Sequence, residues 1–296
     1  AQQLSIEGGG TIDGSGDNPH WKGKERTRPM AVFVTLSDGV TIRNLSVKDA
    51  GMWGVVAMES DHVLISRLDV RSPFGPTRDG IDIVDCHHVL IENCRVYSED
   101  DSICLKSGSA KGVFDVTVRD CHVLRSSVAN ALKLGTASTG SFKKILFENI
   151  VIDGADKAAM AVESVDGADI DDVRFENIRF RDAGTAVFVL LGRRGKPARL
   201  GSIQNVSFAN VRGETRHTWG SAISGTLLDG RAYRPRNLSF DDVHVKSRGG
   251  LKAAAAARSA SPPATPARRS CAKTSRDIPP SKVREIRHHK PLTLFC

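Results

Sequence analysis

The chain has 296 residues, of which 40% are hydrophobic and 5% aromatic, and its 27 glycines indicate many turns. No apolar run reaches the roughly 20 residues that a membrane-spanning helix needs, so we expect no membrane association. Residues 251–296 contain ten Lys/Arg and two Asp/Glu, which accounts for the whole net charge of +8. The first 250 residues are electrically balanced, and we therefore expect no nucleic-acid binding.

A ten-residue pattern recurs eight times between residues 39 and 246, with unit starts 23 to 33 residues apart. Two apolar positions separated by one polar residue are typical of a strand with one buried face. A third apolar position follows three residues later, which indicates a bend onto a second short strand. The first column contains Val40, Val63, Val89, Val116, Ile145, Val173, Val206 and Leu238. The second contains Ile42, Ile65, Ile91, Val118, Phe147, Phe175, Phe208 and Phe240, and the third contains Leu45, Leu68, Cys94, Cys121, Ile150, Ile178, Val211 and Val243.

Just before the bend, seven of the eight units carry Asn or Asp, and Arg67 is the exception. Asn and Asp tolerate the left-handed backbone conformation that such a turn requires. The seven are Asn44, Asn93, Asp120, Asn149, Asn177, Asn210 and Asp242.

These repeats predict an all-β fold, a single parallel β-helix in which each coil stacks on the last. No segment has the 3.6-residue period of a helix, and the units are too short for propeller blades. Cys94 and Cys121 occupy one column in successive units, so we expect stacked core thiols rather than a disulfide. No cysteine or histidine cluster has zinc spacing, and we expect neither a metal nor a cofactor.

The pattern assigns residues 1–250 to the β-helix. Residues 6–14 read like the middle of a repeat array, so we expect the helix to be incomplete at its N-terminal end. Residues 251–296 switch to Ala, Pro, Ser and Arg, a composition that cannot fold by itself. We interpret them as a disordered basic tail or as an out-of-frame end, and assign them no function.

Acidic residues stand where strands give way to loops in two neighbouring units. Asp79 and Asp100 are 21 residues apart, close to one unit, so we expect them side by side, with Asp101 next to them. Glycoside hydrolysis needs one protonated carboxyl and one ionised carboxylate, and clustered acids supply both. The alternatives are that these acids are turn residues or that they form a surface calcium site. Lys106, after the second acidic pair, is interpreted as a flanking charge.

The segments Thr-Arg-Asp-Gly-Ile-Asp (77–82) and Glu-Asp-Asp-Ser-Ile-Cys-Leu-Lys-Ser-Gly (99–108) resemble the Asn-Thr-Asp-Gly and Gly-Asp-Asp motifs of glycoside hydrolase family 28, the polygalacturonase family. The similarity runs from about residue 6 to residue 250. It implies a right-handed parallel β-helix that hydrolyses a pectic or related plant polysaccharide with inversion. Carried over by position, Asp100 would be the general acid, and Asp79 and Asp101 would hold and deprotonate the water.

Two departures from the family pattern concern the substrate. The segment that matches the family's Gly-His-Gly motif, residues 128–135, has no histidine, and residues 160–164 carry Glu163 where the family has Arg-Ile-Lys. The absence of the Arg and Lys of that motif, which grip a substrate carboxylate in the family, argues against galacturonate in the central subsite. It favours a neutral or differently substituted sugar, or an exo-enzyme. The predicted substrate-binding residues are Arg78, Asn130, Lys133, Glu163 and Trp53. Arg78 and Lys133 are expected to restore positive charge, and Trp53 is expected to stack on a sugar face.

Two other functions remain open. A polysaccharide lyase on the same scaffold would use the acids to bind calcium and Lys133 to remove a proton, and a non-catalytic β-helix would bind glycan without turnover. The expected partner is a polysaccharide or oligosaccharide, the expected oligomeric state is a monomer, and the family resemblance implies a secreted or periplasmic location.

Overall fold

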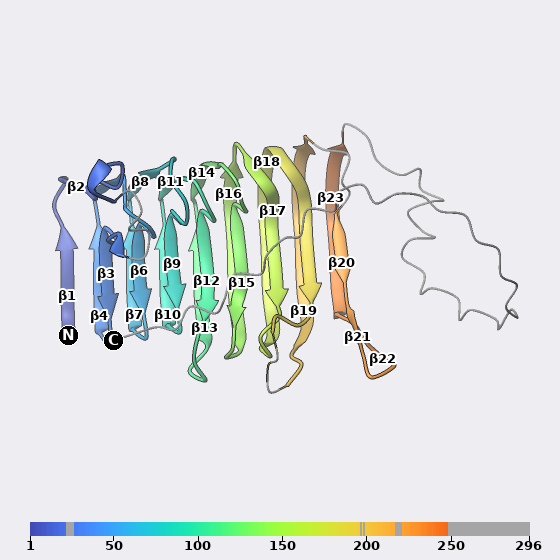
Figure 1. Cartoon of the computed structure of the whole chain (residues 1–296). Helices are drawn as coiled ribbons and strands as arrows, with labels where there is room; N and C mark the ends of the chain where they lie inside the picture. Colours follow the sequence, from blue (N-terminus) through green and yellow to red (C-terminus); the bar gives the residue numbers. More distant parts are fainter. Residues whose placement is uncertain (22–26, 196, 198, 217–220, 248–296) are drawn as a thin grey trace, which may run out of the picture. The chain divides into compact units, whose positions relative to one another are not determined.

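The computed structural model describes residues 1–21, 27–195, 197, 199–216 and 221–247 (Figure 1). These residues form 23 strands and one short 3-10 helix, η1 (Pro19–Trp21). No described helix is long and apolar enough to cross a membrane. The basic segment expected at residues 251–296 lies outside the described residues.

Each coil contributes one strand to each of three parallel ladders. The first ladder contains β1 (Gln2–Glu7), β4 (Asp38–Arg43), β7 (Asp61–Ser66), β10 (His87–Glu92), β13 (Val113–Arg119) and the first parts of β16 (Phe142–Ile152), β18 (Asp169–Leu191), β19 (Ser202–Thr215) and β23 (Arg236–Ser247). The second contains β2 (Thr11–Asp13), β5 (Ser46–Lys48), β8 (Asp69–Ser72), β11 (Arg95–Ser98), β14 (His122–Ser126) and later parts of the same four long strands.

The third ladder carries the acidic segments. It contains β3 (Val32–Thr35), β6 (Val55–Met58), β9 (Ile81–Val84), β12 (Ile103–Ser107), β15 (Leu132–Ser138), β17 (Ala155–Ser164), the end of β18, and β20 (Ala222–Ser224). A small antiparallel hairpin, β21 (Thr226–Leu228) and β22 (Arg231–Tyr233), follows β20.

The register of the first ladder agrees with the sequence repeat. Val89 of β10 pairs with Val63 of β7 on one side and with Val116 of β13 on the other. The column continues in register to Leu238 of β23. Like residues therefore stack in successive coils, and the prediction of a right-handed parallel β-helix is confirmed.

The core is built from these columns. Phe147, Phe175, Phe208 and Phe240 stack face to face, with ring centroids 4.9, 5.1 and 5.0 Å apart in chain order. Stacked rings at this spacing pack tightly and add to the free energy gained by burying apolar surface. The prediction of stacked thiols is also confirmed, because Cys94 and Cys121 are buried and unbridged.

The turns have the backbone conformation predicted for them. All eight residues before the bend have positive φ, including Arg67 at 52°. Asn177 also links neighbouring coils: its Nδ2 donates to Asn149 Oδ1 at 3.0 Å, and its Oδ1 accepts from Asn210 Nδ2 at 2.7 Å. The first residue of every unit has positive φ as well, which the sequence reading missed: Gly39, His62, His88, Asp115, Lys144, Asp172, Asn205 and Asn237.

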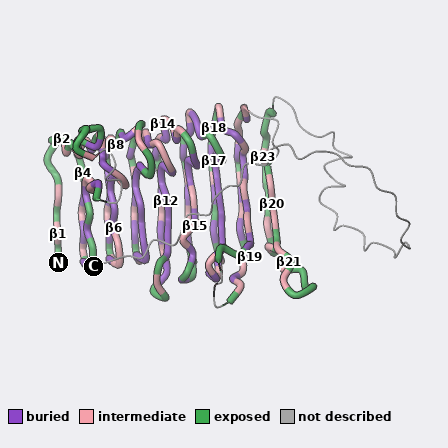
Figure 2. The backbone as a smooth tube through the Cα atoms, viewed as in Figure 1, coloured by how far each residue is buried: buried purple, intermediate pink, exposed green. Residues whose placement is uncertain are grey.

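Burial differs along the helix axis. Figure 2 shows exposed backbone in the strands at the two ends, β1 and β23, and buried backbone in the middle coils. Every residue of β9 and β12 is buried, including the charged residues Asp82 and Lys106. Charged groups without access to water must be paired with each other, which concentrates electrostatic interactions at this part of the third ladder.

Candidate active site

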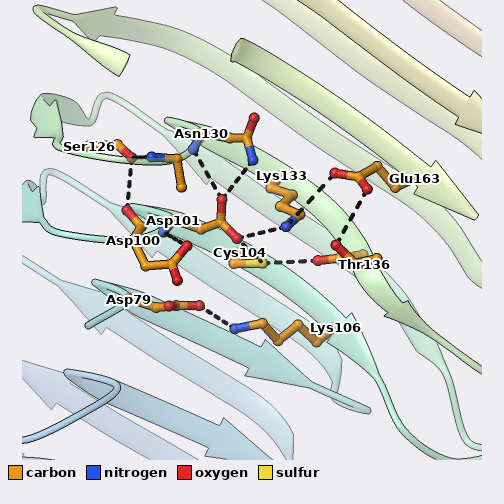
Figure 3. A network of polar contacts seen from close by, with 12 residues as sticks. Asp79, Asp100, Asp101, Cys104, Lys106, Ser126, Asn130, Lys133, Thr136 and Glu163 are labelled. Carbon is orange, nitrogen blue, oxygen red and sulfur yellow. Dashed lines mark hydrogen bonds and ion pairs between the residues drawn. The ribbon is translucent and has the colours of Figure 1, made fainter. Parts of the chain in front are cut away.

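The predicted catalytic acids lie where the chain enters the strands of the third ladder. Asp79 precedes β9, Asp100 and Asp101 precede β12, and Asn130 precedes β15. The three strands pair in register, which puts Asp101 level with both Asp79 and Asn130. The expectation that Asp100 would be the direct neighbour of Asp79 is therefore wrong by one residue, because the coil here is 22 residues long. Figure 3 shows all three carboxyls on one face.

Asp101 is held by hydrogen bonds to both of its oxygens (Figure 3). Its Oδ1 accepts from the Asn130 backbone N–H at 3.1 Å and from Asn130 Nδ2 at 2.8 Å, and its Oδ2 accepts from Lys133 Nζ at 2.8 Å. Burial by itself would raise the pKa of Asp101, but the charges of Lys133 and Lys106 and these hydrogen bonds lower it overall. Asp101 therefore stays ionised.

Asp100 has the opposite environment. Its backbone carbonyl accepts from the hydroxyls of Ser98 and Ser126, both at 2.8 Å, which fixes the chain at this point. Its Oδ1 accepts from the backbone N–H of Asp101 at 3.0 Å, and no ion pair within the described residues involves it. Burial and the neighbouring Asp101 charge raise the pKa of Asp100, so this carboxyl keeps its proton to higher pH than an ordinary aspartate.

Asp79 belongs to a buried cluster that the sequence reading missed. Lys106 Nζ contacts Asp79 Oδ2 and Asp82 Oδ1, and it lies 3.9 Å from the centroid of the Trp53 ring. Burial and the Asp82 charge raise the pKa of Asp79 well above its usual value, although the Lys106 charge opposes them. Burial lowers the pKa of Lys106, but Asp79 and Asp82 outweigh it, so the ammonium stays charged.

The alternation of residues in a strand is the signal that could have revealed this cluster. Ile81 of β9 and Ile103 of β12 point into the core. Side chains alternate along a strand, so Asp82, one residue after Ile81, and Lys106, three residues after Ile103, point away from the core on adjacent strands. Lys106 is thus a member of the site and not a flanking charge.

The same cluster provides the only group of possible metal ligands found among the described residues: Asp79, Asp82 and Cys104, whose ligand atoms lie within 4.8 Å of one another. Calcium prefers six to eight oxygen ligands, whereas this set offers two carboxylates and a thiol. Burial raises the pKa of the Cys104 thiol well above its usual value, and the Lys106 ammonium already contacts both carboxylates. The residues therefore do not fit a calcium ion.

The chain matches the family model for glycosyl hydrolases family 28 over residues 1–265. The protein belongs to this family. Family 28 relatives include a polygalacturonase of Juniperus ashei, 26% identical over 257 residues that cover 70% of this chain and 50% of the relative. Endopolygalacturonase A of Aspergillus flavus is 23% identical and is covered to 62%, with 62% of this chain aligned. The chain spans about half the length of the curated relatives that it matches.

Solved structures of the same fold agree with this assignment. The exopolygalacturonase from Thermotoga maritima superposes with a TM-score of 0.66 at 17% identity, covering 85% of this chain and 67% of that one. The polygalacturonase from Erwinia carotovora also gives 0.66, at 15% identity, covering 85% of this chain and 69% of that one. At these identities, the likeness extends to the β-helix fold.

The segments that depart from the family 28 motifs surround Asp101. Lys133 lies in β15 and pairs with Ala161 of β17, and the Lys133 ammonium is 3.8 Å from Glu163 Oε1. Glu163 Oε2 accepts from the Thr136 hydroxyl at 3.3 Å, and burial raises the pKa of Glu163. Lys133 thus stands between two carboxylates.

The remaining predicted substrate-binding residues have different surroundings. Trp53 lies against the Lys106 ammonium, so one face of its ring is covered and is not free to stack on a sugar. Arg78 is 2% exposed, and its NH2 donates to Asp17 Oδ1 at 2.8 Å rather than to Asp79, Asp100 or Asp101. The structure therefore brings Asn130, Lys133, Glu163 and Trp53 to the acid cluster, and it pairs the Arg78 guanidinium elsewhere.

Proposed function

We propose that the protein hydrolyses a glycosidic bond in a pectic or related plant polysaccharide, with inversion at the anomeric carbon. The observation that carries this proposal is the contrast between two adjacent residues. Asp100 has a raised pKa and no ion-pair partner among the described residues, and Asp101 has a lowered pKa and accepts hydrogen bonds from Asn130 and Lys133. An inverting glycosidase needs one carboxyl in each of these states.

In the proposed reaction, Asp100 donates its proton to the leaving oxygen as the glycosidic bond breaks. A water on the opposite face of the sugar ring attacks the anomeric carbon, and Asp101 takes its proton while Asp79 helps to hold it. The cycle closes when Asp101 loses a proton to solvent and Asp100 gains one. Inversion requires about 6.5–9.5 Å between acid and base carboxyls, to leave space for the water.

The sugar at the cleaved bond is proposed to be neutral or differently substituted rather than galacturonate. Both lysines near the acids are already engaged, Lys106 by Asp79 and Asp82 and Lys133 by Asp101. Glu163 adds a further carboxyl beside Lys133. A substrate carboxylate would have to displace one of these ion pairs, whereas sugar hydroxyls can donate to the carboxylates. We also propose that the protein acts as a monomer and is secreted or periplasmic, as the family resemblance implies.

The test is a sugar-release screen on pectic and neutral polysaccharides with the wild type, Asp100→Asn and Asp241→Asn. Asp241 is an exposed aspartate of β23 and serves as the matched control. We expect new reducing ends from the wild type and the control, and a rate lower by about 10²–10⁴-fold in Asp100→Asn. Ultraviolet absorbance from an unsaturated product would instead indicate a lyase, and substrate binding without turnover would indicate a glycan-binding scaffold. Polygalacturonate as the best substrate would refute the proposed sugar class.

A further inference from the structure

Lys106 is a buried cation that contacts two of the acids directly. The residue is 8% exposed, although lysine is almost never buried unless it is paired. Its ammonium contacts one oxygen of Asp79 and one of Asp82, and the Trp53 ring covers it at 3.9 Å. An aromatic face attracts a desolvated cation, so Trp53 adds to the two ion pairs in fixing the ammonium.

The cluster is not arranged as a self-contained structural ion pair. Asp82 is fully buried, yet its Oδ2 has no hydrogen-bond partner within the described residues. A buried charge cluster stabilises a fold only when its remaining polar atoms are satisfied, and this one leaves an acceptor unpaired. Apolar residues on the strands would pack at least as well. The arrangement therefore needs an explanation other than stability.

That explanation lies in the position of Asp79. Asp79 is level with Asp101 at the entrance to β9, and the Lys106 ammonium reaches it from the adjacent strand β12. We propose that Lys106 is a positioning residue that orients the Asp79 carboxyl for the attacking water and opposes its protonation, with Trp53 as the cover that keeps the ammonium in place. This inference rests on the proposed hydrolase function.

The charges around Asp79 make its protonation depend on Lys106. The groups that face it are Asp82 on its own strand, Asp100, Asp101 and Cys104 at β12, and Lys106 itself. Burial and the neighbouring acids all favour the protonated form of Asp79, and Lys106 is the principal group that favours the ionised form. The pKa of Asp79 is already well above its usual value, and loss of the ammonium would raise it further, so Asp79 would accept hydrogens from the water only at still higher pH.

The experiment compares Lys106→Met, Lys106→Arg and Lys111→Met. Lys111 pairs with exposed Asp61 outside the cluster and controls for the loss of a lysine. In Lys106→Met, we expect kcat to fall about 10²-fold or more, with KM changed less than about threefold, and the acidic limb of the kcat profile to move to higher pH. In Lys106→Arg, the acidic limb should stay close to its wild-type pH. Lys111→Met should match the wild type in both kcat and pH profile. A folded Lys106→Met enzyme with an unmoved acidic limb overturns the proposal.

Two further measurements separate this inference from folding and from the proposed function. If Lys106→Met fails to fold, Lys106→Gln replaces it, because its neutral amide can still donate to the two carboxylates but supplies no charge. Its acidic limb should lie at higher pH than that of the wild type, and a wild-type limb would refute the proposal. If the wild type releases no sugar, the hydrolase proposal fails, and titration of ¹³C-labelled aspartates still tests Lys106. The resonance that disappears in Asp79→Asn should then titrate at higher pH in the lysine variant, and no change would overturn the inference.

Discussion

Asp100 and Asp101 are neighbours in the chain, yet one carboxyl accepts a single hydrogen bond from a backbone N–H and the other accepts three from nitrogen donors, one of them Lys133. The register of β12 with β15 makes Asp101, and not Asp100, level with Asn130, which brings its carboxylate within reach of Asn130 and Lys133. The ladder register thereby gives two adjacent aspartates opposite protonation tendencies, which an acid–base pair requires.

The first prediction is a bell-shaped dependence of kcat/KM on pH. The rate should rise as pH passes the pKa values of the two carboxyls that handle the water, because both must be ionised. The pKa of Asp101 lies below the ordinary value of 3.8, and that of Asp79 lies above it. The rate should fall as pH passes the pKa of Asp100, which burial and Asp101 raise above 3.8, because the acid must keep its proton. Initial rates across pH test this, and Asp100→Glu should move the alkaline limb alone. A rate that keeps rising into the alkaline range would contradict the assignment of Asp100 as the acid.

The second prediction concerns the ammonium that holds Asp101. Lys133→Met removes the largest influence that lowers the pKa of Asp101 and leaves Glu163 without its counter-charge. We expect kcat to fall about 10²-fold, and the acidic limb to move to higher pH because Asp101 becomes harder to ionise. Lys143→Met, at an exposed position of β16, is the control. Equal pH profiles for Lys133→Met and the wild type would show that Asp101 does not depend on this contact.

Much of the fold was predictable because a solenoid repeats the same packing and turn positions in every coil. Columns of like apolar residues indicated the ladder register, and the Asn and Asp residues at the bend indicated left-handed turns. The left-handed conformation of the first residue of each unit could not be predicted, because His62, Asp115 and Lys144 share no residue type. The backbone there turns left-handed whatever the side chain, so composition alone could not reveal it.

The sequence predicted those site residues that belong to a recognisable motif or are separated by about one coil. Asp79, Asp100 and Asp101 were found by their spacing, but which acid lies level with Asp79 depends on a single residue of loop length. Lys106 was undervalued because its role exists only across the β9–β12 pairing. Trp53 lies level with Asp79 in the preceding coil, so its contact with that ammonium likewise depends on strand pairing, here of β6 with β9.

The third prediction tests the aromatic stack. Phe175 is fully buried, with stacked rings on both sides, whereas Phe240 ends the stack and is 47% exposed. Phe175→Ala should lower the free energy of unfolding by about 3–5 kcal/mol through lost burial and the cavity left behind. Phe240→Ala should cost only about 1–2 kcal/mol, since it loses one stacked neighbour and part of its buried area. Urea unfolding at unchanged m-value measures both, and equal losses would contradict the stacked-core account.

The fourth prediction is a stabilising substitution at the one bend that breaks the Asn/Asp pattern. Arg67 has φ of 52°, a left-handed conformation that costs a residue with a Cβ about 1–2 kcal/mol unless its side chain favours it. Asn tolerates this conformation, and in the later coils its amide also donates to the equivalent Asn or Asp of the preceding coil, as Asn149 does to Asp120 at 3.2 Å.

Arg67→Asn should therefore raise the free energy of unfolding by about 0.5–1 kcal/mol, with Arg67→Ala as the control that keeps the backbone penalty and gains no amide contact. Loss of the Arg67 charge near Glu92 should matter little, because Arg119 already pairs with that carboxylate at 2.7 Å. Thermal and urea unfolding of the three proteins decide the matter. If the alanine variant gains as much stability as the asparagine variant, the arginine side chain rather than the turn geometry is the source of the cost.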